Sequence, residues 1–161
     1  MDTLLTLAEV AITMAGFSAI VVIFKRRTTD LWRKTDADRF HGMVIHAIVA
    51  VFFCFLPFLL IEFSANETDV LRVCSGLLCV TTAVIVANAV RLEGTSNAWI
   101  RVTLICSGGI IVALQGINAI WSLSGYILGL YLLGVFWHLA QAAILFVMLI
   151  WIPASQTESD Q

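Results

Sequence analysis

The sequence predicts an all-α, polytopic integral membrane protein with five transmembrane helices in one bundle. Five apolar runs cover most of the 161 residues, and the charged residues lie almost entirely between them. The composition indicates the same class, because 60% of the residues are hydrophobic and only 12% are charged. A hydrocarbon core about 30 Å thick needs about 20 apolar residues at about 1.5 Å per residue. The predicted spans cover about 4–24, 43–63, 70–90, 100–121 and 126–152.

The first span is expected to remain as a helix. Met1 to Thr3 contains no basic residue, and no small-residue cleavage site precedes Lys25, so a cleaved signal peptide is not expected. The segment from Ala15 to Ala19, followed by an aliphatic run and Lys25-Arg26-Arg27, resembles small bacterial membrane proteins. This resemblance implies the bacterial cytoplasmic (inner) membrane and carries no activity.

The loop after the first span is strongly basic and contains one tryptophan. Two interpretations remain open: a segment at the headgroup level that contacts anionic lipid or a partner, or a solvated loop with one interfacial tryptophan. The candidate contact residues are Lys25, Arg26, Arg27, Trp32, Arg33 and Lys34.

The second helix is expected to begin near Asp36, before its apolar run starts. Pro57 should kink this span in its outer half, because proline has no N–H for the helix. A neighbouring group is expected to satisfy the carbonyl that the proline leaves without a donor.

Small residues at four-residue spacing predict which faces of the spans pack against neighbouring helices. The first span carries Ala11, Ala15 and Ala19, and the third carries Ser75, Cys79, Ala83 and Ala87. The fourth carries Gly109 and Ala113, and Gly125 with Gly129 starts the fifth. Residues 153–161 are short and polar, which predicts a disordered cytoplasmic tail.

The basic residues predict the orientation of the bundle. Eight of the nine lie between the first and second spans or between the third and fourth, and only Arg72 lies on the other side. The positive-inside rule therefore places the N-terminus outside and the C-terminus in the cytoplasm.

Polar residues within the apolar runs form the candidate intramembrane site, since each one costs free energy without a partner. Counting from the span ends places Glu9, Gln115 and Asn118 in the outer half, where one polar cluster is expected. A functional cluster would bind a proton or a cation in a transport path. The structural alternative is a carboxyl group that joins helices or reaches to the outer surface.

His138 lies near the middle of the fifth span, three residues before Gln141 on the same helix face. Its imidazole can donate, accept, titrate or bind a metal. Haem binding would pair it with His46, but the span ends place the two about 10 Å apart along the membrane normal. A hydrogen bond within the bundle, for example to Gln115, is favoured instead.

No catalytic, nucleotide or metal signature is found, and the four cysteines form no CxxC pair, so no enzyme, cofactor or nucleic-acid partner is expected. The leading hypothesis is an oligomeric ion channel or small transporter. The first alternative is an accessory or assembly subunit, and the second is a haem or metal protein. Expected partners are lipid, a second copy of the chain or another membrane protein.

Overall fold

A computed structural model describes residues 2–28, 34–63, 66–91, 98–121 and 125–150. These residues form five α-helices, and no strand occurs among them. The helices are α1 (Asp2–Thr28), α2 (Lys34–Ile61), α3 (Glu67–Arg91), α4 (Ala98–Trp121) and α5 (Ile127–Ile150). Helices α2 to α5 each contain a stretch that is long and apolar enough to cross a membrane. The predicted tail 153–161 lies outside the described residues.

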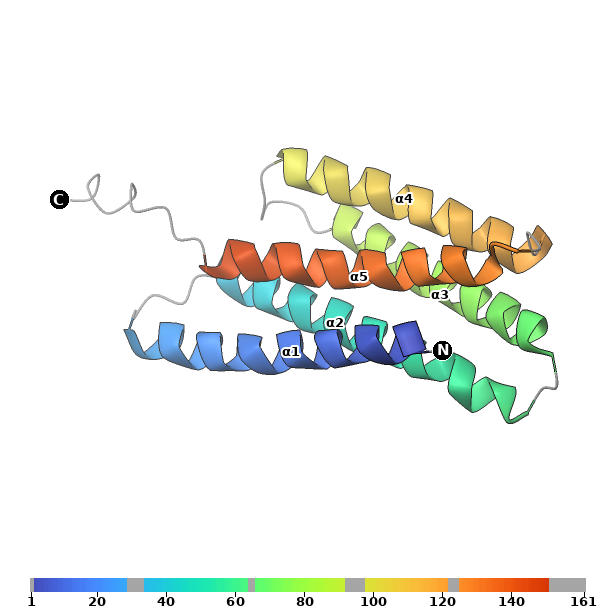
Figure 1. Cartoon of the computed structure of the whole chain (residues 1–161). Coiled ribbons are helices and arrows are strands. Elements are labelled where there is room, and N and C mark those ends of the chain that lie inside the picture. The colour runs from blue at the N-terminus through green and yellow to red at the C-terminus, as the bar shows by residue number, and fades with distance from the viewer. Residues whose placement is uncertain (1, 29–33, 64–65, 92–97, 122–124, 151–161) are drawn as a thin grey trace.

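The helices run side by side and alternate in direction (Figure 1). Helix α5 is central, since it contacts all the other four helices. Helices α1 and α4 lie on opposite edges of the bundle, and no contact joins them within the described ranges. Aliphatic and aromatic side chains of α1, α2, α3 and α5, including Leu4, Phe53, Leu78 and Val135, form the main core.

Helix α2 begins well before the apolar run that predicted it. It starts at Lys34, close to the expected position near Asp36, whereas the predicted span starts at 43. Charged residues continue the helix beyond the apolar stretch, because helical backbone bonding does not depend on apolar side chains. A depth counted from residue 43 is therefore too shallow for every residue on this helix.

Pro57 lies inside α2, and a side chain from α5 compensates for its missing N–H. In a regular helix the N–H of residue 57 would donate to the carbonyl of Phe53. The hydroxyl of Tyr131 donates to that Phe53 carbonyl instead. Tyr131 is fully buried. The expectation that a neighbour satisfies the freed carbonyl is confirmed.

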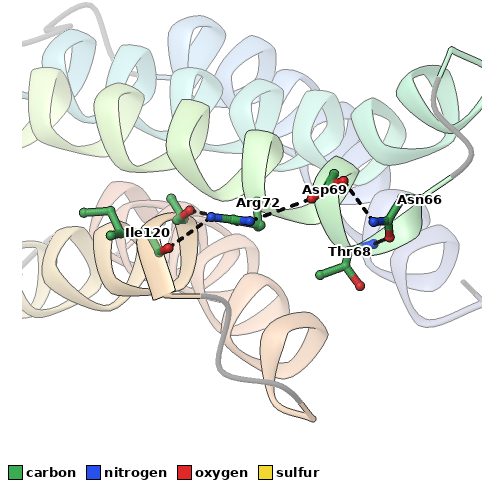
Figure 2. A network of polar contacts seen from close by, with 6 residues as sticks. Asn66, Thr68, Asp69, Arg72 and Ile120 are labelled. Carbon is green, nitrogen blue, oxygen red and sulfur yellow. Dashed lines mark hydrogen bonds and ion pairs between the residues drawn. The ribbon is translucent and has the colours of Figure 1, made fainter.

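Two arginines bind carbonyls near the C-terminal end of a neighbouring helix. Arg72 of α3 donates from Nε to the Ala119 carbonyl (3.2 Å) and from Nη2 to the Ile120 carbonyl (3.1 Å) at the end of α4, as Figure 2 shows. Arg39 of α2 donates to the Met148 carbonyl near the end of α5 (3.3 Å). A cation at a helix C-terminus is favourable because unpaired carbonyls give that end a partial negative charge.

The start of α3 is fixed by Asn66, which acts as its N-cap (Figure 2). The Asn66 side-chain oxygen accepts from the backbone N–H of Thr68 (3.1 Å), and its amide group donates to Asp69 (2.9 Å). Asp69 also lies 3.8 Å from Arg72, so the cap of α3 and the C-terminus of α4 belong to one network. This network gives Arg72 a structural role at the end of the bundle where the other basic residues are absent from the predicted loops.

The predicted α3 positions Ser75 and Cys79 do face α4, but the close glycine on α4 is not the predicted one. A Cβ added to Gly108 would lie 2.5 Å from Val86, whereas Gly109 has open space around it. Ala113, the other member of the predicted α4 face, is exposed. The predicted fifth-span pair is also wrong, because Gly125 precedes α5 in a turn with φ of 99°.

Candidate functional site

Two histidines and a threonine from three helices form a hydrogen-bonded chain in the interior. His46 Nδ1 of α2 lies 3.0 Å from His138 Nδ1 of α5. His138 Nε2 lies 3.1 Å from the Thr82 hydroxyl of α3, which donates to the Leu78 carbonyl (2.8 Å). His138 and Thr82 are fully buried, and His46 is 4% exposed. This chain joins three of the five helices.

With the Thr82 hydroxyl donating to Leu78, one assignment of protons fits both neutral rings. The Thr82 hydroxyl has one proton and gives it to Leu78, so its oxygen must accept a proton from His138 Nε2. A neutral His138 then has a bare Nδ1, which accepts from the N–H at Nδ1 of His46. His46 consequently presents an unprotonated Nε2.

The expected difference in depth between the two histidines is wrong. Along α2 from Arg39 to His46 to Phe53, the partner on α5 changes from Met148 to His138 to Tyr131. That order is the register of two antiparallel helices, and it places the imidazoles at one level. The error came from measuring depth on α2 from residue 43 instead of from the start of the helix.

Direct contact between the rings does not fit haem. A bis-histidine haem needs the iron and the porphyrin plane between the two ligating nitrogens. The two Nδ1 atoms are already within hydrogen-bond distance, and Trp137 packs edge-on against both rings at 5.6 and 5.0 Å between centroids. No group of three or more metal-binding side chains occurs in the part of the chain that the structure describes.

Gln115 and Asn118 form a second polar group, between α4, α3 and α5. The Gln115 amide donates to the Leu130 carbonyl (2.6 Å), and the Asn118 amide donates to the Ser75 hydroxyl (2.8 Å) and the Ile127 carbonyl (3.0 Å). Both side chains are fully buried. The hydrogen bond from Gln115 to His138 that the sequence favoured does not form, because each of these groups has another partner.

The side-chain amide nitrogens of Gln115 and Asn118 have hydrogen-bond partners, but in the described part of the chain their oxygens do not. Gln115 Oε1 and Asn118 Oδ1 are buried and have no hydrogen-bond partner among the described residues. Buried acceptors of this kind are unusual and costly. Gly134 lies close to the Gln115 side chain, because a Cβ added to Gly134 would lie 2.5 Å from Gln115 Nε2.

Glu9 does not join this site. It is exposed on α1, and α1 does not contact α4 within the described ranges. Gln141 is 8% exposed on α5, and the structure gives its amide no hydrogen bond to another described side chain. The structure therefore brings Gln115 and Asn118 together but separates both from Glu9.

The expected lipid-contact residues are only partly covered by the structure. Trp32 and Arg33 lie outside the described residues. Lys25, Arg26 and Arg27 belong to the last turns of α1, and Lys34 is the first residue of α2.

Several residues of the site were not predicted from the sequence: Ser75, Thr82, Ser107, Tyr131 and Trp137. Ser107 accepts from the indole N–H of Trp137 (3.1 Å), which ties α4 to α5 beside the histidines. A serine or threonine hydroxyl in a membrane helix can donate to a backbone carbonyl of its own helix. Its presence in the sequence therefore does not indicate that it contacts another helix. Counting depth on the second helix from its expected start near Asp36, instead of from residue 43, would have placed His46 close to the level of His138.

No family model, curated protein or solved structure matches this chain. Thr82 donates within its own helix, whereas the Gln115, Asn118, Tyr131 and Trp137 donors bond to acceptors of neighbouring helices. This arrangement is suited to holding helices together.

Proposed function

We propose that this chain is a non-enzymatic, multi-pass membrane component, an accessory or assembly subunit whose buried polar groups join its helices rather than line a path. The observation that carries the proposal is the pairing of polar groups across helices. His46 and Thr82 bond to His138 of α5, and Tyr131 of α5 donates to the Phe53 carbonyl of α2. The Gln115 and Asn118 amides donate to α5 carbonyls. Interhelical hydrogen bonds of this type stabilise membrane bundles, because lipid offers no competing partner.

The proposal includes α1 as a fifth span, with the N-terminus outside and the C-terminus in the cytoplasm. Support comes from one end of the bundle, where the basic ends of α1 and α3 and the starts of α2 and α4 occur together (Figure 1). Arg72, at the other end, is occupied by the α4 carbonyls. The proposed location is a bacterial cytoplasmic membrane, with anionic headgroups near the basic first loop.

Flux measurements with the purified full-length chain test the proposal. In liposomes it should carry no more H⁺, Na⁺ or K⁺ than protein-free liposomes carry, at acidic or neutral pH. His138→Leu should lower the free energy of unfolding by roughly 1–3 kcal/mol, because it leaves His46 and Thr82 without their partner. Ile144→Leu, at an exposed position on the same helix, is the matched control.

A small transporter is the second candidate, and the two unpaired amide oxygens favour it. Gln115 Oε1 and Asn118 Oδ1 are three residues apart on α4 and could accept from a water molecule or bind a small cation. Flux above that of empty liposomes, lost in a folded Gln115→Leu variant, would contradict the subunit proposal and establish this one.

A further inference from the structure

The outward face of α1 is more polar than a lipid-facing surface should be. Five exposed residues follow one another at alternating spacings of three and four: Thr6, Glu9, Thr13, Gly16 and Ile20. We call this row the α1 stripe. The opposite face of the helix is apolar and packed into the bundle, where Leu4, Ala8 and Ala11 are at most 1% exposed.

The spacing of the α1 stripe is that of a helix–helix seam. Residues that recur on average every 3.5 positions stay in line between two helices crossing at about 20°. Gly16 has nothing within 4 Å of the position a Cβ would take, so its backbone is open to close approach by another helix. The α1 stripe therefore has the geometry of an interface that nothing within the described chain covers.

Glu9 is the residue of the α1 stripe that most needs a hydrogen-bond partner from another helix. It lies about two turns into α1, and in a spanning helix its exposed carboxyl group would face hydrocarbon. The nearest hydroxyls on the stripe donate to their own backbone, Thr6 to the Asp2 carbonyl (3.1 Å) and Thr13 to the Glu9 carbonyl (2.7 Å). Their oxygens keep lone pairs that can accept a proton from a carboxylic acid on an adjacent helix.

We propose that α1 pairs in parallel with α1 of a second copy of this chain, through the α1 stripe and with the two Glu9 carboxyl groups in contact. This inference rests on the proposed topology, in which α1 spans the membrane. Two copies insert in the same orientation, so a two-fold axis along the membrane normal brings equal residues to equal depth. A different partner would need its own polar group at that depth.

A second copy suits Glu9 because a protonated carboxyl group is self-complementary. It has one donor and one acceptor, so two of them satisfy each other, with the Thr6 and Thr13 oxygens beside them. Parallel pairing also brings the Asp2 carboxylates of the two copies near each other. Asp2 lies at the end of α1 in water, where salt screens the repulsion between them.

Energy transfer between donor- and acceptor-labelled copies in liposomes tests the pairing. Wild type and Glu9→Gln should associate, since an amide is also self-complementary. Glu9→Leu should weaken association at least about tenfold, because the hydrogen bonds between the two Glu9 carboxyl groups are lost. Val10→Leu, at the exposed neighbouring position, should associate like wild type. Equal association of Glu9→Leu and wild type would overturn the proposal.

Cross-linking locates the contact and keeps this inference separate from the proposed function. In a cysteine-free full chain in native membranes, Thr13→Cys should oxidise to a dimer of twice the chain mass, and Ile12→Cys should not. A Thr13→Cys adduct with another protein would overturn self-pairing. Labelling of Asp2→Cys from outside and of Asp38→Cys, after the following loop, from the cytoplasmic side shows separately whether α1 spans. A spanning but monomeric chain would reject the pairing and leave the proposed topology intact.

Discussion

Single residues in this bundle are stabilised by partners on other helices. Tyr131 illustrates this point, because its hydroxyl replaces the donor that Pro57 removes from α2. His138 serves two helices at once through its two ring nitrogens. The sequence predicted that something would satisfy the carbonyl freed by Pro57, but not which residue, because that choice depends on the register between α2 and α5.

A double-mutant cycle tests the link between Pro57 and Tyr131. Tyr131→Phe alone should lower the free energy of unfolding, because the Phe53 carbonyl loses its donor in a buried site. In a Pro57→Ala background the helix regains its own N–H donor, so Tyr131→Phe should cost less. The expected coupling is about 0.6–1.7 kcal/mol, measured by unfolding in detergent micelles. Equal costs of Tyr131→Phe in the two backgrounds would show that the hydroxyl does not replace the proline's missing donor.

The helices themselves are stabilised at their ends by neighbouring helices. Arg72 binds the last carbonyls of α4, and Arg39 binds one near the end of α5. Both arginines were counted in the sequence only as charges that set the orientation. Their structural role could not be predicted, since it depends on which helices are adjacent.

Replacing Arg72 should destabilise α4 at its C-terminus. Arg72→Met is expected to lower the free energy of unfolding by about 0.5–1 kcal/mol, a modest effect because the side chain is 41% exposed and water competes. Asp69→Asn leaves both carbonyl contacts in place and should change stability much less. If the two variants lose equal stability in thermal unfolding, the ion pair between Arg72 and Asp69 matters more than the hydrogen bonds from Arg72 to the α4 carbonyls.

For the molecule as a whole, the apolar runs predicted the five helices but not their rotation about their own axes. Counting residues from the span ends placed Gln115 and Asn118 close together on one face of a helix, and both side chains are buried against α5. Rotation depends on packing against neighbours, so Glu9 was assigned to an interior that it does not face. The charged start of α2 adds about two and a half turns of helix before residue 43, at about 3.6 residues per turn. Depth was counted without these turns, so the contact between His46 and His138 was missed.

Cysteine accessibility tests the central claim, a spanning bundle whose polar interior is closed to water. Single cysteines replace Asp2, Asp38 and Ser75 in a cysteine-free full chain, and a membrane-impermeant maleimide is applied to right-side-out and inverted vesicles. Asp2→Cys should react only from outside and Asp38→Cys only from the cytoplasmic side. Ser75→Cys, at a fully buried position beside Asn118, should react from neither side. Reaction at Ser75→Cys in a folded protein would reveal a water-filled path and contradict the account.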